Sequence, residues 1–137
     1  MLLISIVFWP FRVQLRIPAI IKNTGLVLLI AGGALLFFAI RTLKSNFRPS
    51  LKPPLQGALI TAGLYSVVRH PAYGAIVISL FGLSVWLDDG VRAVLLVCLL
   101  LYFGAKAKAE EQWLEKTYPE YREYKKRVPK RFIPWVI

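Results

Sequence analysis

Three long apolar stretches of the sequence contain no charged residue, and they constrain the fold more than any other feature. Residues 24–40 and 71–87 are each 17 residues long, and residues 93–105 form a stretch of 13. A helix that crosses the hydrocarbon core of a bilayer needs about 20 residues, with a range of roughly 17 to 25. We therefore predict three transmembrane helices, the third lengthened by its flanks. Residues 1–11, apolar but broken by Pro10, are predicted to be half of a fourth helix or an interfacial segment.

The composition excludes a water-soluble domain. Hydrophobic residues make up 57% of the 137 residues, whereas soluble domains contain about 45 to 50%, and a core of this size cannot hide the surplus. The formal net charge of +11 would also suit a nucleic-acid partner. However, the basic residues gather at the ends of the apolar stretches and no nucleic-acid-binding motif accompanies them. We therefore predict a membrane protein that does not bind nucleic acid.

The distribution of charge predicts the topology. Residues 41–69 contain five basic residues and no acidic one, and residues 106–137 contain nine basic and five acidic residues. The link between the second and third apolar stretches is Asp88-Asp89-Gly90. By the positive-inside rule, the 41–69 connection and the tail are cytoplasmic and the Asp-Asp tip faces outside. Three basic residues that would also face outside run against this rule: Arg12, Arg16 and Lys22.

The chain is predicted to be all-α and to have two parts. Residues 1–58 hold the N-terminal membrane helix or helices and an interfacial loop, in which Pro49, Pro53 and Pro54 prevent a regular helix. Residues 59–137 form one structural unit, a membrane hairpin followed by a cytoplasmic helical tail.

The tail continues the third membrane helix. Residues 103–116 are rich in strong helix formers, so the helix is predicted to leave the membrane and to end near Tyr118, before Pro119. Tyr121, Tyr124 and the basic run 125–127 then mix aromatic and cationic side chains. This mixture is typical of a segment that lies along lipid headgroups.

The candidate functional residues fall in two places that the predicted topology brings together. His70, the only histidine, stands just before the second apolar stretch, whereas Glu110 and Glu111 lie in the tail. Taken separately, His70 is compatible with an interfacial belt of side chains, and the glutamate pair is compatible with a salt-bridged helix surface. Because a hairpin with a three-residue tip brings its two ends close together, residues near 70 and residues 106–111 should meet. Ionisable residues gathered at membrane depth indicate a functional site.

Four motifs follow one another in this chain: Gly63-x-Tyr65-x-x-x-Arg69-His70-Pro71-x-Tyr73, Glu110-Glu111-x-x-Leu114, Tyr121-x-x-Tyr124-x-x-Arg127-Val128-Pro129 and Ile133-Pro134. In order and spacing they resemble the C-terminal half of the isoprenylcysteine carboxyl methyltransferase family, over roughly residues 61–134. The resemblance implies an integral-membrane enzyme that takes a methyl group from S-adenosylmethionine and needs no metal.

The resemblance also implies roles for particular residues. The implied cofactor-binding residues are Gly63, Tyr65, His70, Pro71, Ala72, Tyr73, Glu110 and Glu111. A carboxylate can bind the ammonium and ribose hydroxyls of S-adenosylmethionine, and an aromatic face can stabilise its sulfonium. Arg69 and Lys106 are the predicted catalytic residues. Lys106 stands where family members have an arginine that contacts the acceptor, and lysine lacks the planar, two-pronged grip of arginine on a carboxylate.

The implied acceptor is a lipophilic small molecule or a lipidated chain, with a carboxylate as the methylated group. The N-terminal part is shorter than in relatives, so the groove for the lipid is either narrower or completed by a second subunit. Two alternatives stay open, a membrane NADPH-dependent sterol-type reductase with a similar hairpin, and a non-catalytic membrane protein on the same scaffold. A titration with both cofactors distinguishes the three.

Overall fold

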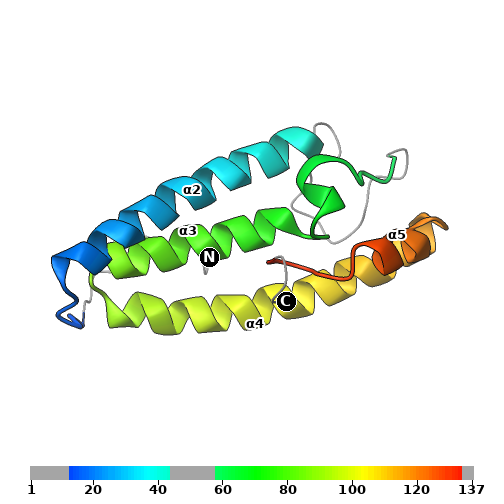
Figure 1. Cartoon of the computed structure of the whole chain (residues 1–137). Helices are drawn as coiled ribbons and strands as arrows, with labels where there is room; N and C mark the ends of the chain where they lie inside the picture. Colours follow the sequence, from blue (N-terminus) through cyan, green and yellow to red (C-terminus); the bar gives the residue numbers. More distant parts are fainter. Residues whose placement is uncertain (1–12, 44–57, 134–137) are drawn as a thin grey trace. The chain divides into compact units, whose positions relative to one another are not determined.

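The structure, a computed structural model, describes residues 13–43 and 58–133, and this part of the chain is helical (Figure 1). The helices are α2 (Ala19–Leu43), the short 3-10 helix η2 (Gly63–Ser66), α3 (Pro71–Trp86), α4 (Gly90–Thr117) and α5 (Tyr121–Arg127). The predicted all-α class is therefore confirmed. The predictions for residues 1–11, for the proline-rich loop and for Pro134 lie outside the described residues.

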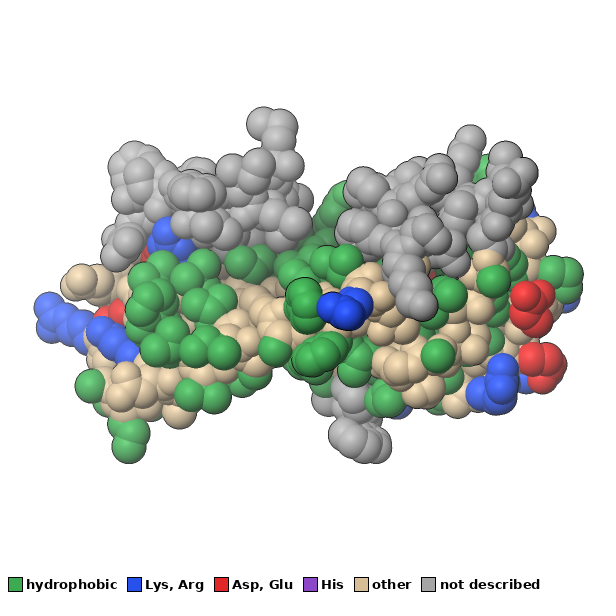
Figure 2. Space-filling view, turned by 90° about the horizontal axis from the view of Figure 1, so that it is seen from above, with side chains coloured by type: hydrophobic (Ala, Val, Ile, Leu, Met, Phe, Trp, Pro, Cys, Tyr) green, Lys and Arg blue, Asp and Glu red, His purple; other side chains and the backbone are tan. Residues whose placement is uncertain are grey.

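Each of the three apolar stretches forms a helix. With 25 and 28 residues, α2 and α4 are long and apolar enough to cross a membrane, whereas α3 is apolar but shorter, with 16 residues. In the most apolar 18-residue segment of α2, only 11% of the residues are buried. Ile20, Val27 and Ile30 are exposed along this helix. Figure 2 shows hydrophobic side chains uncovered over much of the visible surface. An exposed apolar surface of this extent is more compatible with contact to lipid than with contact to water.

The helix α4 also continues past its apolar stretch, as predicted. It runs without a break from Gly90 through the polar residues 106–116 and ends at Thr117, two residues before Pro119. Proline has no backbone N–H and disfavours a helical residue before it, which accounts for the end of the helix.

Two compact units contain the described residues. One consists of residues 13–34 and Ala75–Tyr102, and the other of residues 35–43, 58–74 and 103–133. Each of the three long helices contributes to both units. The predicted division of the chain at residue 58 stays a prediction.

Within the first unit, glycines allow α2 and α3 to approach closely. A methyl group added at Gly82 of α3 would lie 2.5 Å from the carbonyl oxygen of Gly25 and 2.5 Å from the amide nitrogen of Leu29, both in α2. Both neighbouring atoms belong to the backbone of a helix, so neither can move without shifting the helix itself. By contrast, a methyl group at Gly33 would meet no atom within 4 Å.

We expect Gly82→Ala to destabilise the protein and Gly33→Ala to leave it unchanged or slightly more stable. Overpacking at Gly82 should cost about 1 to 3 kcal/mol, whereas alanine at the open Gly33 position gains about 0.5 to 1 kcal/mol of helix propensity. Thermal unfolding of the detergent-solubilised variants measures the difference. Equal unfolding temperatures for the two variants would contradict the close packing of α2 and α3.

The acidic tip between α3 and α4 holds the segment that precedes α2. The Asp88 carboxylate accepts hydrogen bonds from the amides of Leu15 and Ile17, each at 3.1 Å, and pairs with Lys22 at 2.9 Å. Asp89 is fully buried and forms an ion pair with Arg92. The tip thus binds the segment before α2 to the hairpin. Lys22, one of the three basic residues that do not follow the positive-inside rule, forms an ion pair with Asp88.

In the second unit, the tyrosines around α5 form a small core. Tyr118, Tyr121, Tyr124 and Val128 are buried together, and the Tyr124 hydroxyl donates a hydrogen bond to the carbonyl oxygen of Tyr65 at 2.7 Å. Tyr121 and Tyr124 therefore face the protein interior, while the position of this segment along lipid headgroups stays a prediction. Their burial between α5 and its neighbours could not be read from the tail's mixed composition. Burial also raises the pKa of Tyr124 to about 12, so its hydroxyl stays protonated and remains a donor.

Candidate active site

The start of α3 and the end of the described chain lie against each other. The amides of Arg69 and His70 donate hydrogen bonds to the carbonyl oxygens of Lys130 and Arg131, at 3.0 and 2.7 Å. The helix α3 begins at Pro71, and the His70 carbonyl accepts the amide of Tyr73. A methyl group at Gly74 would collide with the backbone of Phe132, so glycine at this position allows the close contact. These bonds fix the backbone from which the candidate side chains project.

The first group of side chains, which we call the Glu110 cluster, comprises His70, Tyr73, Lys106 and Glu110. The Tyr73 hydroxyl donates a hydrogen bond to Glu110 Oε1 at 2.6 Å, and Lys106 Nζ lies 3.7 Å from the same oxygen. His70 Nδ1 is 3.7 Å from Glu110 Oε2. The Glu110 side chain is 16% exposed, so it remains open to a ligand. The predicted meeting of residues near 70 with residues 106–111 is confirmed.

Aromatic rings line the Glu110 cluster. The ring of Tyr73 stacks on Phe103, with centroids 4.5 Å apart, and on His70, with centroids 5.5 Å apart. Phe132 meets His70 and Tyr73 at centroid distances of 6.1 and 6.3 Å. The ammonium of Lys106 lies 5.4 Å from the centre of the Tyr73 ring. The cluster therefore combines a carboxylate, a cation and aromatic faces.

The second group, which we call the Glu111 cluster, surrounds a buried carboxylate. The Glu111 side chain is only 3% exposed and has four cationic or imidazole neighbours. They are Arg69 (Nε to Oε1, 2.9 Å), His70 (Nε2 to Oε1, 3.3 Å), Arg131 (Nη2 to Oε2, 3.2 Å) and Lys125 (Nζ to Oε2, 3.5 Å). Both carboxylate oxygens are therefore already in use within the protein.

These neighbours keep Glu111 ionised. The residue lies beyond the apolar stretch of α4, which ends at Ala105. Burial alone would raise the pKa of its carboxyl group, but the hydrogen bonds from His70, Arg131 and Arg69, together with the charge of Arg69, outweigh burial. The pKa of Glu111 consequently lies well below its usual range.

The remaining predicted residues lie around these two clusters. Arg69 is buried, and besides Glu111 it binds the carbonyl oxygen of Val128, at 2.6 Å from Nη1. Pro71 and Ala72 form the first turn of α3. Gly63 has a φ of +60°, a conformation that glycine adopts without strain, and it starts η2. Tyr65 is buried, and burial is the main reason that its pKa is raised, with a smaller contribution from Glu110.

Sequence reasoning missed four residues of the site: Phe103, Lys125, Arg131 and Phe132. Phe103 stood inside an apolar stretch and Lys125 inside a basic run, so neither differed from its neighbours. Arg131 and Phe132 reach the site only because residues 130 and 131 bond to Arg69 and His70, a long-range contact with no local signal. Gly74, directly after Tyr73, was the one hint that another segment approaches there.

Comparison with known proteins fits this geometry. The family model described as phospholipid methyltransferase matches residues 21–121. The chain belongs to the phospholipid methyltransferase family. The match covers α2, α3 and α4 with the Glu110 cluster. Protein-S-isoprenylcysteine O-methyltransferase B of Arabidopsis thaliana is 32% identical over 136 residues, covering 96% of this chain and 67% of that protein. The cobalt-zinc-cadmium resistance protein CzcN of Cupriavidus metallidurans is 35% identical over 75 residues, covering 54% of this chain and 35% of that protein.

A solved structure extends the likeness to the fold. The eukaryotic intramembrane Ras methyltransferase, isoprenylcysteine carboxyl methyltransferase, matches with a TM-score of 0.79 and 25% identity over 98% of this chain and 48% of that one. The predicted resemblance to this group is thus confirmed, and together with the apolar helices the match supports an integral membrane protein. A shorter match is the delta(14)-sterol reductase of Mus musculus, 38% identical over 85 residues, 57% of this chain and 19% of that enzyme. The chain spans between about a third and two thirds of the length of the relatives it matches first.

The residues present fit S-adenosylmethionine at the Glu110 cluster better than at Glu111. The methionine part of this molecule is a zwitterion, and Glu110 and Lys106 offer one partner for its ammonium and one for its carboxylate. Tyr73 and Phe103 offer aromatic faces for its sulfonium. Glu111, by contrast, has no oxygen left for a ligand.

Proposed function

We propose that the protein is a membrane methyltransferase that uses S-adenosylmethionine to methylate a lipophilic acceptor, with a carboxylate as the methylated group. The observation that carries the proposal is the Glu110 cluster. It combines a partly exposed carboxylate, a lysine and stacked aromatic rings, and it lies where the apolar helices α3 and α4 join polar segments of the chain. Family membership and the relatives that are isoprenylcysteine methyltransferases support it.

Each residue of the cluster has a proposed role. Glu110 binds the ammonium of the methyl donor, Tyr73 orients Glu110 through its 2.6 Å hydrogen bond, and Lys106 pairs with a carboxylate of the donor or of the acceptor. When bound, S-adenosylmethionine supplies an electrophilic methyl group. A carboxylate acceptor is already nucleophilic, so the chain's residues must mainly align it and exclude water.

Arg69 and Glu111 are proposed as positioning residues. Arg69 is buried and occupied by Glu111 and Val128, so it holds His70 and the C-terminal segment in place and does not touch the acceptor. Gly63 and Tyr65 act likewise as neighbours that shape the turn before α3. The positive-inside rule, applied to the basic residues of the 41–69 connection and of the tail, supports a site on the cytoplasmic side.

The test is a titration of the detergent-solubilised chain with S-adenosylmethionine and with NADPH by isothermal calorimetry. Binding of S-adenosylmethionine, followed by transfer of a radiolabelled methyl group to a farnesylcysteine analogue, is the expected result. Binding of NADPH alone would instead favour the reductase function, which the match to the sterol reductase motivates. If neither cofactor binds, the scaffold is non-catalytic.

A further inference from the structure

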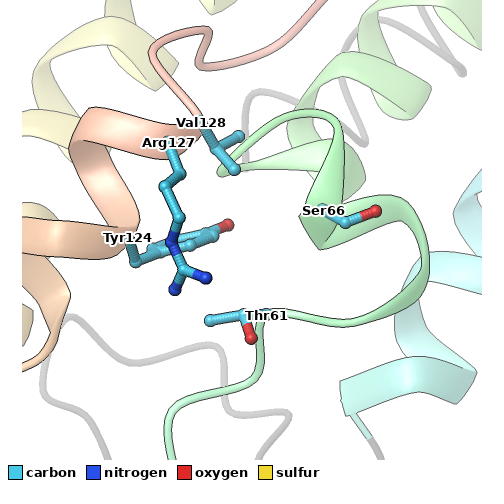
Figure 3. Close-up of a pocket in the computed structure, with 5 residues that line it drawn as sticks. All are labelled: Thr61, Ser66, Tyr124, Arg127 and Val128. Atoms are coloured by element: carbon cyan, nitrogen blue, oxygen red, sulfur yellow. The ribbon is translucent and has the colours of Figure 1, made fainter.

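A cavity of about 190 Å³ opens between η2 and α5, outside both clusters of the candidate active site. Thr61, Ser66, Tyr124, Arg127 and Val128 line it (Figure 3). In Figure 3 the side chain of Arg127 extends from α5 past Tyr124 in the direction of Thr61. Tyr124 and Val128 are buried, so one wall of the cavity is fixed, while Arg127 is exposed and points into an open space.

Arg127 differs from three of the cationic residues near it, each of which has an acidic partner. Lys125 pairs with Glu111 and Glu115, Lys126 pairs with Glu123 at 2.7 Å, and Arg131 pairs with Glu111. In the described ranges 13–43 and 58–133, no carboxylate forms an ion pair with Arg127. Glu123, one turn earlier on α5, interacts with Arg127 only at longer range, so the guanidinium at the mouth of the cavity is available to an anion.

We propose that this cavity binds the phosphate group of a phospholipid headgroup. Arginine binds phosphate through two parallel N–H bonds, and the cavity is large enough for a phosphate with part of its substituent. Phospholipids are at hand because α5 follows α4, a helix apolar and long enough to cross a membrane, after a break of only three residues. Basic residues just beyond a membrane helix are drawn to anionic lipid. The bound lipid is a ligand of the fold and is distinct from the methyl acceptor.

The experiment measures lipid bound to the detergent-solubilised full chain by native mass spectrometry with phosphatidylglycerol. We expect Arg127→Gln to lower phosphatidylglycerol occupancy about tenfold, and Arg127→Lys to lower it less because lysine keeps the charge. The matched control is Lys126→Gln, which removes the same charge from the neighbouring position outside the cavity and should leave occupancy nearly unchanged. Equal losses in the two glutamine variants would mean general attraction to the basic tail and would overturn the proposal.

Two further measurements separate the remaining outcomes. Inorganic phosphate at millimolar concentration should compete only weakly with phosphatidylglycerol, whereas full displacement would assign the cavity to free phosphate. Arg127→Gln should bind S-adenosylmethionine as the unmodified chain does. A parallel loss of both ligands would assign the cavity to the methyl-donor site and would overturn the proposal, while loss of donor binding in Glu110 variants tests the proposed function separately.

Discussion

Glu111→Gln is expected to destabilise the protein by about 3 to 5 kcal/mol, the largest loss of stability of any single change that we predict. Glutamine keeps the shape of the side chain but removes the charge that holds Arg69, Arg131 and Lys125. The guanidinium of Arg69, which is almost completely buried, would then lack its counter-charge. Thermal unfolding in detergent, followed by circular dichroism, measures the loss.

The matched control for this change is Glu115→Gln. Glu115 lies one turn further along α4 and forms one ion pair, with Lys125 at 2.8 Å, but its side chain is 29% exposed. Surface ion pairs contribute about 0 to 1 kcal/mol, so this variant should unfold close to the unmodified protein. If both variants lose the same stability, Glu111 is not the buried hub that its four neighbours indicate.

The lowered pKa of Glu111 predicts how the stability of the protein depends on pH. The pKa of Glu111 is lowered in the folded protein, so the folded state favours the ionised carboxylate. Its contribution is therefore complete above the ordinary pKa of a glutamate, about 4.3, and is lost as the pH falls below that value. Unfolding temperatures measured between pH 6 and pH 3 should fall steeply for the unmodified protein and less steeply for Glu111→Gln. Parallel curves would contradict the lowered pKa.

Much of the fold follows from local sequence patterns. Charge-free stretches predicted three helices, and Pro71 and Pro119 marked one start and one end correctly. The meeting of His70 and Tyr73 with residues 106–111 followed from hairpin topology alone, because a short tip between antiparallel helices leaves little freedom. These predictions depend on helix length and backbone chemistry, which the sequence carries locally.

The rest depended on contacts that no local pattern encodes. Composition and spacing alone do not show that Glu110 and Glu111, adjacent on one helix, face different neighbours, so that Glu111 is enclosed and Glu110 stays open. Tyr121 and Tyr124 looked interfacial because their neighbours are basic, but their rings face inward. For the glutamates and the tyrosines alike, the direction of the side chain around its helix determines its burial. The backbone hydrogen bonds of residues 130 and 131 to the start of α3 bring Arg131 to Glu111.

That difference between the two glutamates yields the second large effect. Glu110→Gln is expected to weaken binding of S-adenosylmethionine about 10- to 100-fold, because a charge-assisted hydrogen bond contributes roughly 1.5 to 3 kcal/mol. The variant should fold normally, since the nitrogens of Lys106 and His70 each lie 3.7 Å from the Glu110 carboxylate, farther than the 2.9 Å that separates Arg69 from Glu111. Isothermal calorimetry gives the affinity, and thermal unfolding gives the stability.

Tyr73→Phe and Glu123→Gln are the companion variants. Tyr73→Phe keeps the ring stacked on Phe103 but removes the hydroxyl that orients Glu110, so its affinity should fall by less than that of Glu110→Gln. Glu123→Gln removes an equal charge from an exposed pair with Lys126 and should bind the donor normally. Glu110 and Glu111 thus lead to opposite predictions, loss of binding without loss of stability at Glu110 and loss of stability at Glu111. Unchanged donor binding in Glu110→Gln would remove this carboxylate from the donor site.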